Sequence, residues 1–184
     1  MNVILFGAPG AGKSVQANLL HKNLDYQIIS MGQLLRNAMK KNTPTGRYIR
    51  ETVGKGELVS NKVCSTLLQH AVNPIQPIVF DGFPRSEDQL SIVNASHLSG
   101  KIIVLDTDYD TIYRRLINRG RHDDTDTIIK NRWDIYQTTT LPLIEKLRLK
   151  YNIHSIDANQ DIETIHKTIC NLIGKVDESL RDDT

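Results

Sequence analysis

One segment constrains the fold of this 184-residue chain more than any other, the run GAPGAGKS from Gly7 to Ser14. It follows an apolar run at residues 2–6 and precedes residues 13–23, which have the composition of a helix. It therefore matches the pattern G-x-x-x-x-G-K-[ST] in the strand, loop and helix context that this motif requires. Its glycines let the backbone curl, so that amide groups and a helix N-terminus face an anion. The segment predicts a phosphate-binding loop at the end of a buried strand.

Two side chains of this loop carry its chemistry. Lys13 supplies a point charge for the β- and γ-phosphates of a nucleotide, and Ser14 offers a hydroxyl to Mg²⁺. On its own, this motif predicts only that a nucleotide is bound.

Short runs of β-branched residues alternate with longer helical stretches along the rest of the chain. The strands that they predict lie at residues 2–6, 26–29, 77–81, 101–106 and 152–157. These runs are continuously apolar, which is typical of parallel strands covered on both faces. We therefore expect an α/β fold, a doubly wound five-stranded parallel sheet with helices on both faces.

Capping residues mark two of the predicted helices. One follows the fourth strand and is bounded by Asp108 or Asp110 at its start and by Gly120 at its end. The other follows Asp161, which is suited to the N-cap. Its predicted apolar face consists of Ile162, Ile165, Ile169 and Leu172.

Two stretches interrupt the alternation of strands and helices. Residues 30–59 hold two helical patterns with no strand between them, which predicts a small helical insertion. Residues 120–126, GRHDDTD, form a polar loop before a long helix that meets Pro142 late. We expect one domain over residues 1–184, with its core at 1–29, 60–119 and 127–184.

Composition excludes several classes of function. The 23 basic and 21 acidic side chains leave a net charge of +2, too weak a field to draw nucleic acid or a membrane surface. Cys64 and Cys170 are isolated, and the six histidines show no metal-binding spacing, so no structural zinc is expected. The apolar run at the N-terminus is too short for a signal peptide or a membrane span. These features fit a cytoplasmic protein.

Five segments of the chain resemble the signature segments of the adenylate kinase family and appear in the same order. They are GAPGAGKSVQ, ISMGQLLR, GKGELVSNKV, FDGFPRSEDQ and RLINRGRHDD. Members of this family are nucleoside monophosphate kinases. The resemblance covers nearly the whole chain and is closest to members with a short lid. It implies a phosphotransferase that moves the γ-phosphoryl group of Mg-ATP reversibly onto AMP, giving two ADP. Residues 30–59 would bind AMP, residues 120–126 would form the lid, and the enzyme would be a monomer.

The resemblance also implies site residues. The catalytic set is Lys13, Arg85, Arg119, Arg121 and Arg132. The ATP-binding set is Gly10, Ala11, Gly12, Lys13, Ser14, Val15, Arg119 and Gln160. The AMP-binding set is Met31, Arg36, Glu57, Leu58, Val59, Gly82, Phe83, Pro84, Arg85, Gln89, Arg121 and Arg132.

Several of these residues have a chemical rationale of their own. Asp81 ends an apolar strand, where open α/β sheets place ligands, and can hold waters of Mg²⁺. The guanidinium of Arg85 can bind a phosphate through two hydrogen bonds. Arg115 and Arg119 share a helix face, so they repel each other unless an anion lies nearby. The amide of Gln89 can both donate to and accept from adenine.

The chain departs from the family pattern at a few positions. Ser14 and Val15 replace a usual Gly-Thr pair, Met31 stands where threonine usually contacts adenine, and Gln33 stands where aspartate usually supports the magnesium waters. The segment IDANQD lacks a usual glycine, although Gln160 still falls where a backbone carbonyl would meet adenine. Two alternatives follow, a UMP/CMP kinase of the same fold and a nucleotide-binding module with impaired catalysis. Retention of the lysine, Asp81 and the arginines argues against impaired catalysis.

Overall fold

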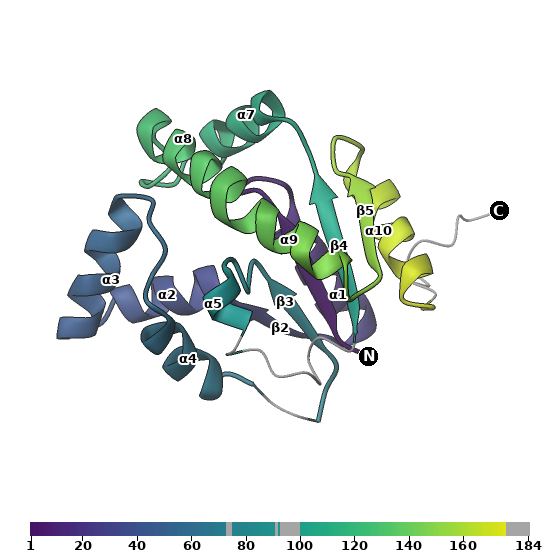
Figure 1. Ribbon diagram of the computed structural model, residues 1–184, viewed down its shortest axis with the longest axis horizontal. Helices are drawn as coiled ribbons and strands as arrows, with labels where there is room; N and C mark the ends of the chain where they lie inside the picture. Colours follow the sequence, from purple (N-terminus) through teal and green to yellow (C-terminus); the bar gives the residue numbers. More distant parts are fainter. Residues whose placement is uncertain (73–74, 91, 93–99, 176–184) are drawn as a thin grey trace.

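The protein is built around a five-stranded parallel sheet with the strand order β2-β3-β1-β4-β5 (Figure 1). The computed structural model describes residues 1–72, 75–90, 92 and 100–175. The strands are β1 (Val3–Gly7), β2 (Gln27–Ser30), β3 (Ile78–Asp81), β4 (Lys101–Asp106) and β5 (Ile153–Asp157). All five expected strands are present, and the predicted parallel sheet is confirmed.

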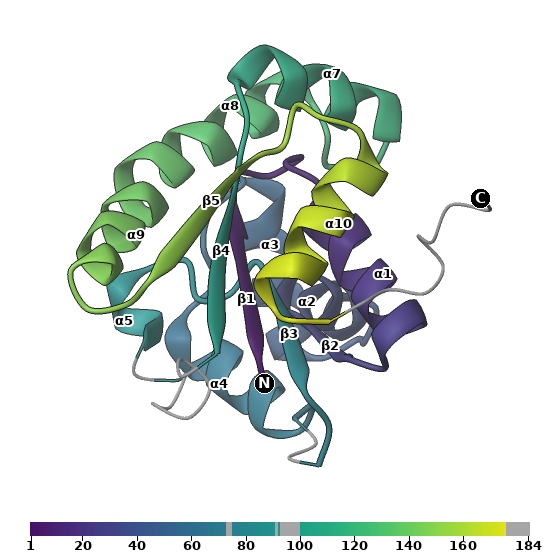
Figure 2. The ribbon, with the colours of Figure 1, turned by 90° about the vertical axis from the view of Figure 1, so that its right-hand side faces the viewer.

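Helices cover both faces of this sheet. They are α1 (Lys13–Leu24), α2 (Met31–Met39), α3 (Pro44–Gly54), α4 (Asn61–Gln69), α5 (Glu87–Leu90), α7 (Tyr109–Arg119), α8 (Asp126–Ile135), α9 (Leu141–Arg148) and α10 (Ile162–Leu172). Figure 2 shows α1 and α10 on one side of the sheet, with α8 and α9 on the other. The sequence patterns did not predict α4 and α5.

Alternate residues of the central strand face opposite layers of the core. Val3 and Leu5 of β1 pack in the cluster that contains residues of α1 and α10, whereas Ile4 and Phe6 pack in the cluster on the other face. All four are at most 2% exposed, because β1 is covered on both faces. This burial explains the continuous apolar run in the sequence.

The two capped helices follow the sequence closely at their starts. Asp108, not Asp110, caps α7, and it accepts a hydrogen bond from the Thr111 amide at 2.8 Å. Asp161 caps α10 and accepts from the Thr164 amide at 2.8 Å. The predicted apolar face of α10 was wrong at Ile162, which is 54% exposed. The buried face of this helix is made by Ile165, His166, Ile169 and Cys170.

The long helix expected after the polar loop is interrupted. A π-helical turn, η1 (Tyr136–Thr140), separates α8 from α9, and Pro142 falls in the first turn of α9. Such turns are rare and often lie at functional sites. Here the turn buries Tyr136 and Thr140 against the strand-end loops of the sheet.

Helices α2 and α3 follow the edge strand β2 with no strand between them (Figure 1). They lie within residues 30–59, the stretch that we call the insertion. Residues 120–126 connect α7 to α8. The predicted core segments 60–119 and 127–184 include residues 73–74, 91, 93–99 and 176–184, which lie outside the described residues. Within the described residues, no helix is both long and apolar enough to cross a membrane.

Candidate active site

The GAPGAGKS segment forms a loop at the carboxyl end of β1, the central strand. Gly7, Gly10 and Gly12 have φ values of 141°, 90° and 94°, which other residues rarely adopt. At Gly7 the backbone also passes close to β4, since a Cβ there would lie 2.5 Å from the carbonyl oxygen of Leu105. The loop leads directly into α1, which begins at Lys13. The N-terminus of α1 therefore faces the space above the strand ends, as anion binding requires.

The Lys13 side chain is folded beneath this loop. Its ammonium group donates to the carbonyl oxygens of Gly7 and Ala8, each at 2.7 Å, and the residue is 8% exposed. Burial lowers the pKa of Lys13 to about 8; Asp81 opposes this shift, and the nearby Arg85 adds to it. An ammonium group has three donors, so a third is available for a phosphate oxygen.

Asp81 ends β3 and lies beside the loop. One of its carboxylate oxygens accepts from the Ser14 hydroxyl at 2.6 Å and from the Ser30 hydroxyl at 2.9 Å. Mg²⁺ prefers oxygen donors of this kind. The residues present beside the loop therefore fit a magnesium ion. Gln33 does not join these residues, since its amide oxygen accepts from Arg36 at 2.9 Å.

Two clefts open on the phosphate-binding loop. The first, which we call the α2 cleft, lies between the loop, α2, the segment after α3, the 120–126 loop and Arg132 of α8. All predicted AMP-binding residues line it except Gly82 and Pro84. Those two line a small adjoining pocket together with Arg85, Arg132 and Thr140.

The inner wall of the α2 cleft is apolar. Met31 is 4% exposed, and it lines this wall with Leu35, Val53, Val59 and Cys64. Of these, the sequence reasoning missed Leu35, Val53 and Cys64. Their only signal was the helical spacing of apolar residues in the insertion, which equally describes an ordinary core.

The second cleft, the α10 cleft, lies between the loop, α7 and the first turn of α10. Every predicted ATP-binding residue lines it, including Val15 and Gln160. It has a volume of about 1010 Å³. Gly10, Lys13, Ser14, Arg119 and Arg121 line both clefts, so the two clefts meet at the phosphate-binding loop.

Hydrogen bonds hold Arg85 in place in the lining of the α2 cleft. Its Nε donates to the Gly82 carbonyl at 2.8 Å, and its amide donates to the side-chain oxygen of Gln89 at 2.8 Å. Thr140 of the π-helical turn donates to the Arg85 carbonyl at 2.9 Å. Burial lowers the pKa of Arg85, although Asp81 opposes the shift. The side-chain oxygen of Gln89 is therefore already bonded, and its NH₂ group is the part that can donate to a ligand.

Carboxylates of the 120–126 loop pair with the arginines that flank it. Asp124 accepts two hydrogen bonds from Arg119, at 2.7 and 2.8 Å, and lies 3.6 Å from Arg132. Asp123 pairs with Arg132, and the pKa of Asp123 is lowered because this pairing outweighs the effect of burial. Sequence reasoning missed both aspartates, although two carboxylates inside a run of arginines were a signal.

Arg115 and Arg119 share a helix face, and the protein itself supplies a partner for each: Arg119 pairs with Asp124, and Arg115 donates to the Ala158 carbonyl at 2.8 Å. Among the described residues, no group of three or more His, Cys, Asp or Glu side chains could hold a metal ion.

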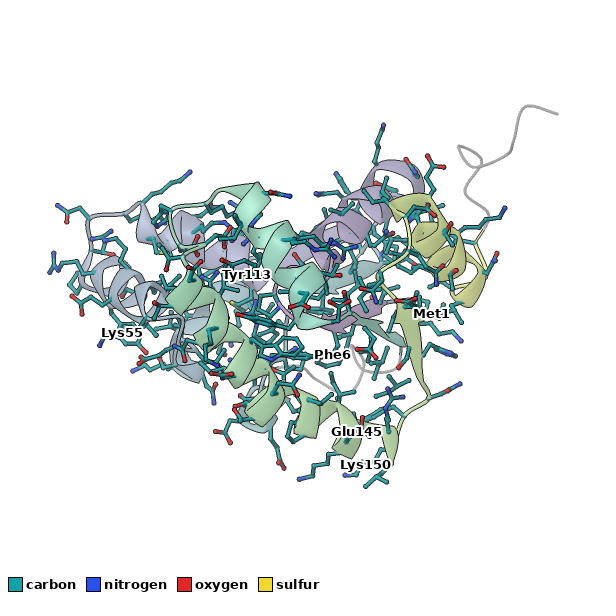
Figure 3. The ribbon with its side chains drawn as sticks, turned by 90° about the horizontal axis from the view of Figure 1, so that it is seen from above. Met1, Phe6, Lys55, Tyr113, Glu145 and Lys150 are labelled. Carbon is teal, nitrogen blue, oxygen red and sulfur yellow. The ribbon has the colours of Figure 1, made fainter. Side chains whose placement is uncertain are left out.

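The segment that ends the insertion contacts α8 beside the α2 cleft. The side-chain amide of Asn131 in α8 donates to the Lys55 carbonyl at the end of α3. Gly56 is buried against the same helix, with a φ of 75°, and a Cβ there would lie 3.2 Å from Asn131. Figure 3 labels Lys55 beside the blue helices of the insertion. The insertion and α8 are therefore in contact in this structure.

Comparison with known proteins agrees with this geometry. The family model described as adenylate kinase matches residues 5–151. The chain belongs to the adenylate kinase family. It is 35% identical over 174 residues to the adenylate kinase of Prochlorococcus marinus strain MIT 9301, an alignment that covers 91% of this chain and 96% of that protein.

Other adenylate kinases are similar over comparable lengths. Adenylate kinase 1 of Nostoc sp. strain PCC 7120 is 33% identical, with 89% of this chain and 93% of that protein covered. The adenylate kinase of Oenococcus oeni is 27% identical, with 95% and 98% covered.

Proposed function

We propose that this protein is an adenylate kinase that transfers the γ-phosphoryl group of ATP to AMP and gives two ADP. One observation carries the proposal: two clefts meet at Lys13, Arg119 and Arg121. A nucleotide in each cleft would bring its phosphates to the same cationic centre. ATP is assigned to the α10 cleft, because more of the phosphate-binding loop lines it, including Ala11 and Gly12, and AMP to the α2 cleft.

Two parts of the α2 cleft support the assignment of AMP to it, the arginines and the apolar wall. Arg36 and Arg85 supply positive charge for a monophosphate, and both line the cleft. The apolar wall around Met31 suits the face of a base, while the Gln89 amide offers a hydrogen-bond donor at its edge. The two arginines and the apolar wall thus match the phosphate and the base of a nucleoside monophosphate.

Phosphoryl transfer requires little covalent work of the protein. Its transition state spreads negative charge over three oxygens, so positioning and positive charge are the main contributions. Lys13, Arg119, Arg121 and Arg132 are the groups that we propose to supply that charge. The AMP phosphate is already anionic near neutral pH and therefore needs no general base.

Magnesium bound with ATP would bridge and neutralise phosphate oxygens. Asp81 and Ser14 are the residues that we propose to hold it, Asp81 through water, since their oxygens lie together beside the loop. Ser14 thereby supplies the hydroxyl, while Val15 is 42% exposed and has none.

Residues 120–126 are proposed as a short lid, and residues 30–59 as the AMP-binding insertion. Closure of both would exclude water, which would otherwise accept the phosphoryl group. In the structure Arg119 and Arg132 bind lid carboxylates, so these carboxylates hold the two guanidinium groups near the loop. We propose a monomer, as the resemblance to the family implies. We propose the cytoplasm as its compartment, because ATP and AMP are available there.

The test is an assay of ADP formation from Mg-ATP with AMP, UMP and CMP in turn. We expect AMP to give the highest kcat/KM. If UMP or CMP is preferred, the protein is a UMP/CMP kinase and the proposal is wrong. If no monophosphate is phosphorylated although ATP binds, the protein is a binding module.

A variant links this activity to the loop. Lys13→Ala should fold normally but lower kcat by several orders of magnitude, because it removes charge that is needed most in the transition state. Near-normal turnover in this variant would contradict the assignment of the loop.

A further inference from the structure

Helix α2 forms one wall of the α2 cleft, and two of its polar residues lie just outside that wall. Leu35, Arg36 and Met39 line the cleft. Gln33 and Asn37 are exposed and lie outside the residues that line it. The proposed function assigns neither of them a role, although Gln33 is a position at which this chain departs from the family pattern. Both, however, bear on the placement of Arg36.

The guanidinium group of Arg36 is folded back on the first turn of α2. Its Nη2 donates to the side-chain oxygen of Gln33 at 2.9 Å. A Cβ at Gly32 would lie 3.2 Å from Arg36 Nη1, so the guanidinium lies against the helix where glycine leaves room for it. A long, flexible side chain that is held in one place before binding loses less entropy when a ligand arrives.

Asn37 fixes the orientation of the Gln33 amide. Gln33 Nε2 donates to Asn37 Oδ1 at 2.9 Å. Because the NH₂ group is used in this way, the oxygen of Gln33 faces the guanidinium, which offers only donors. Residues three and four apart share a helix face, so the three side chains form one chain of hydrogen bonds along α2.

The contact with Gln33 leaves the charge of Arg36 uncompensated. Unlike Arg119 and Arg132, Arg36 forms no ion pair with a carboxylate among the described residues. Burial lowers the pKa of Arg36, and the nearby Arg121 adds to this shift. An anion is therefore favoured beside Arg36. Gln33 is a neutral amide, so it restrains the guanidinium without taking the place of that anion.

We propose that Gln33 is a positioning residue for the phosphate group of AMP. It holds Arg36 at the α2 cleft through a hydrogen bond and leaves the positive charge available to the phosphate. A carboxylate at position 33 would also hold the guanidinium, but it would compete with the phosphate for it. This inference rests on the proposed assignment of AMP to the α2 cleft and gives that site a residue that acts without touching the ligand.

The first test compares Gln33→Glu with Gln69→Glu. Both variants add one negative charge with almost no change in size. Gln69 ends α4, is exposed, and lies outside the lining of both clefts. We expect Gln33→Glu to weaken AMP binding about fivefold, as a competing exposed ion pair with Arg36 would. Gln69→Glu should bind AMP as the parent does.

The measured quantities are the dissociation constants for AMP and for adenosine, by calorimetry without ATP. Adenosine has the same sugar and base but no phosphate, so its binding should be equal in the parent and in Gln33→Glu. A merely structural role for Gln33 would weaken both ligands together, which would overturn the inference. In the kinetic assay KM for AMP should rise, while kcat and KM for ATP stay near the parent values.

Gln33→Met separates the hydrogen bond from the charge. Methionine keeps the length of the side chain but neither accepts strongly from Arg36 nor repels a phosphate. We expect it to weaken AMP binding by only about twofold, as the loss of one exposed hydrogen bond would. An effect as large as that of Gln33→Glu would contradict the role of charge.

The second test asks whether Gln33 acts through Arg36. AMP binding is measured in Arg36→Met and in the double variant that also carries Gln33→Glu. If the effect passes through the guanidinium, Gln33→Glu should matter much less once Arg36 is absent. An undiminished loss in the double variant would show that position 33 acts on the ligand directly, and the inference would be wrong.

The outcomes separate the two proposals. If the parent protein does not phosphorylate AMP with ATP, the proposed function is wrong. If the parent is active but Gln33→Glu and Gln69→Glu have the same dissociation constant for AMP, only the positioning inference is wrong.

Discussion

At the scale of single residues, Lys13 combines burial with positive charge. It is 8% exposed, and its ammonium group donates to the carbonyl oxygens of Gly7 and Ala8, each at 2.7 Å. Burial disfavours the charged form of a lysine, which is the form that binds phosphate.

The lowered pKa of Lys13 predicts a pH dependence. In the folded protein the lysine loses its proton near pH 8, well below its ordinary value of 10.5. A phosphate binds the protonated form, so kcat/KM for ATP should fall as the pH rises above about 8. Between 8 and 10.5 the unfolded chain binds more protons at this site than the folded protein does. The contribution of Lys13 to stability without nucleotide should therefore rise with pH, opposite to activity.

A pH profile of kcat/KM, compared with the melting temperature without nucleotide, checks this prediction. Lys13→Arg is the control, because arginine stays charged throughout this range. Any activity that this variant retains should lack the fall near pH 8. An unchanged profile would show that another group causes the fall.

Met31 predicts a loose preference among acceptors. It is buried in the wall of the α2 cleft, where its thioether packs against a base without a strong hydrogen bond. Met31→Thr should sharpen the preference for AMP over CMP by up to about tenfold, because polar contacts reject analogues more strongly than apolar ones. The measurement is kcat/KM for AMP, UMP and CMP in the parent, Met31→Thr and Gln89→Ala. Equal ratios in the parent and Met31→Thr would refute the idea.

Residues whose type is dictated by phosphate chemistry were predicted from the sequence. Lys13, Gly10, Gly12 and the five predicted arginines each line at least one of the two clefts, because a motif specifies both residue type and place. Residues that act on other protein groups were missed. Asp124 and Asn131 bond to Arg119 and Lys55, which lie 5 and 76 positions away in the sequence. Such pairings depend on the folded geometry.

At the scale of elements, strands and helices with clear periodicity or caps were predicted close to their observed bounds. The central strands β1, β3 and β4 are buried on both faces, so burial and sequence pattern agree there, whereas the edge strands β2 and β5 are only partly buried. The π-helical turn at Tyr136–Thr140 was not predicted, because its wider hydrogen-bond spacing has no marker in the sequence YQTTT. Ile162 was misassigned to the core because α10 begins at the rim of the α10 cleft.

The turn after α3 offers a test of closure. Gly56 has a φ of 75° and is packed against α8, whereas Gly54 ends α3 with no atom within 4 Å of an added Cβ. Gly56→Ala should destabilise the protein by about 1–2 kcal/mol, from backbone strain and contact with Asn131. It should also raise KM for AMP several-fold by separating the insertion from α8.

Gly54→Ala provides the matched control. It should be neutral or slightly stabilising, because alanine favours helix. Thermal unfolding and AMP kinetics measure both effects. A Gly56→Ala protein with parental KM for AMP would contradict a role for this contact in closure.

At the scale of the whole molecule, the sequence predicted the sheet and its parallel direction but not its strand order. The order follows from which strands pair, and pairing depends on contacts across the core. The family resemblance supplied the clefts that periodicity alone could not locate.

The proposed magnesium requirement can be tested on the whole protein. EDTA in excess of Mg²⁺ should abolish turnover, while the melting temperature without nucleotide stays unchanged. A zinc-selective chelator should change neither quantity. Stoichiometric zinc in the purified protein, or a lower melting temperature after EDTA, would contradict the prediction.

The central place of β1 also bears on how the protein is made. Val3 pairs with Val79 of β3 on one side and with Lys101 of β4 on the other. A ribosome therefore releases the phosphate-binding loop long before the strands that support it exist. Contacts so distant in sequence slow folding, because a long loop must close first. Nascent chains that end before β4 should consequently be unable to retain a nucleotide, because β1 then lacks one of the two strands that flank it.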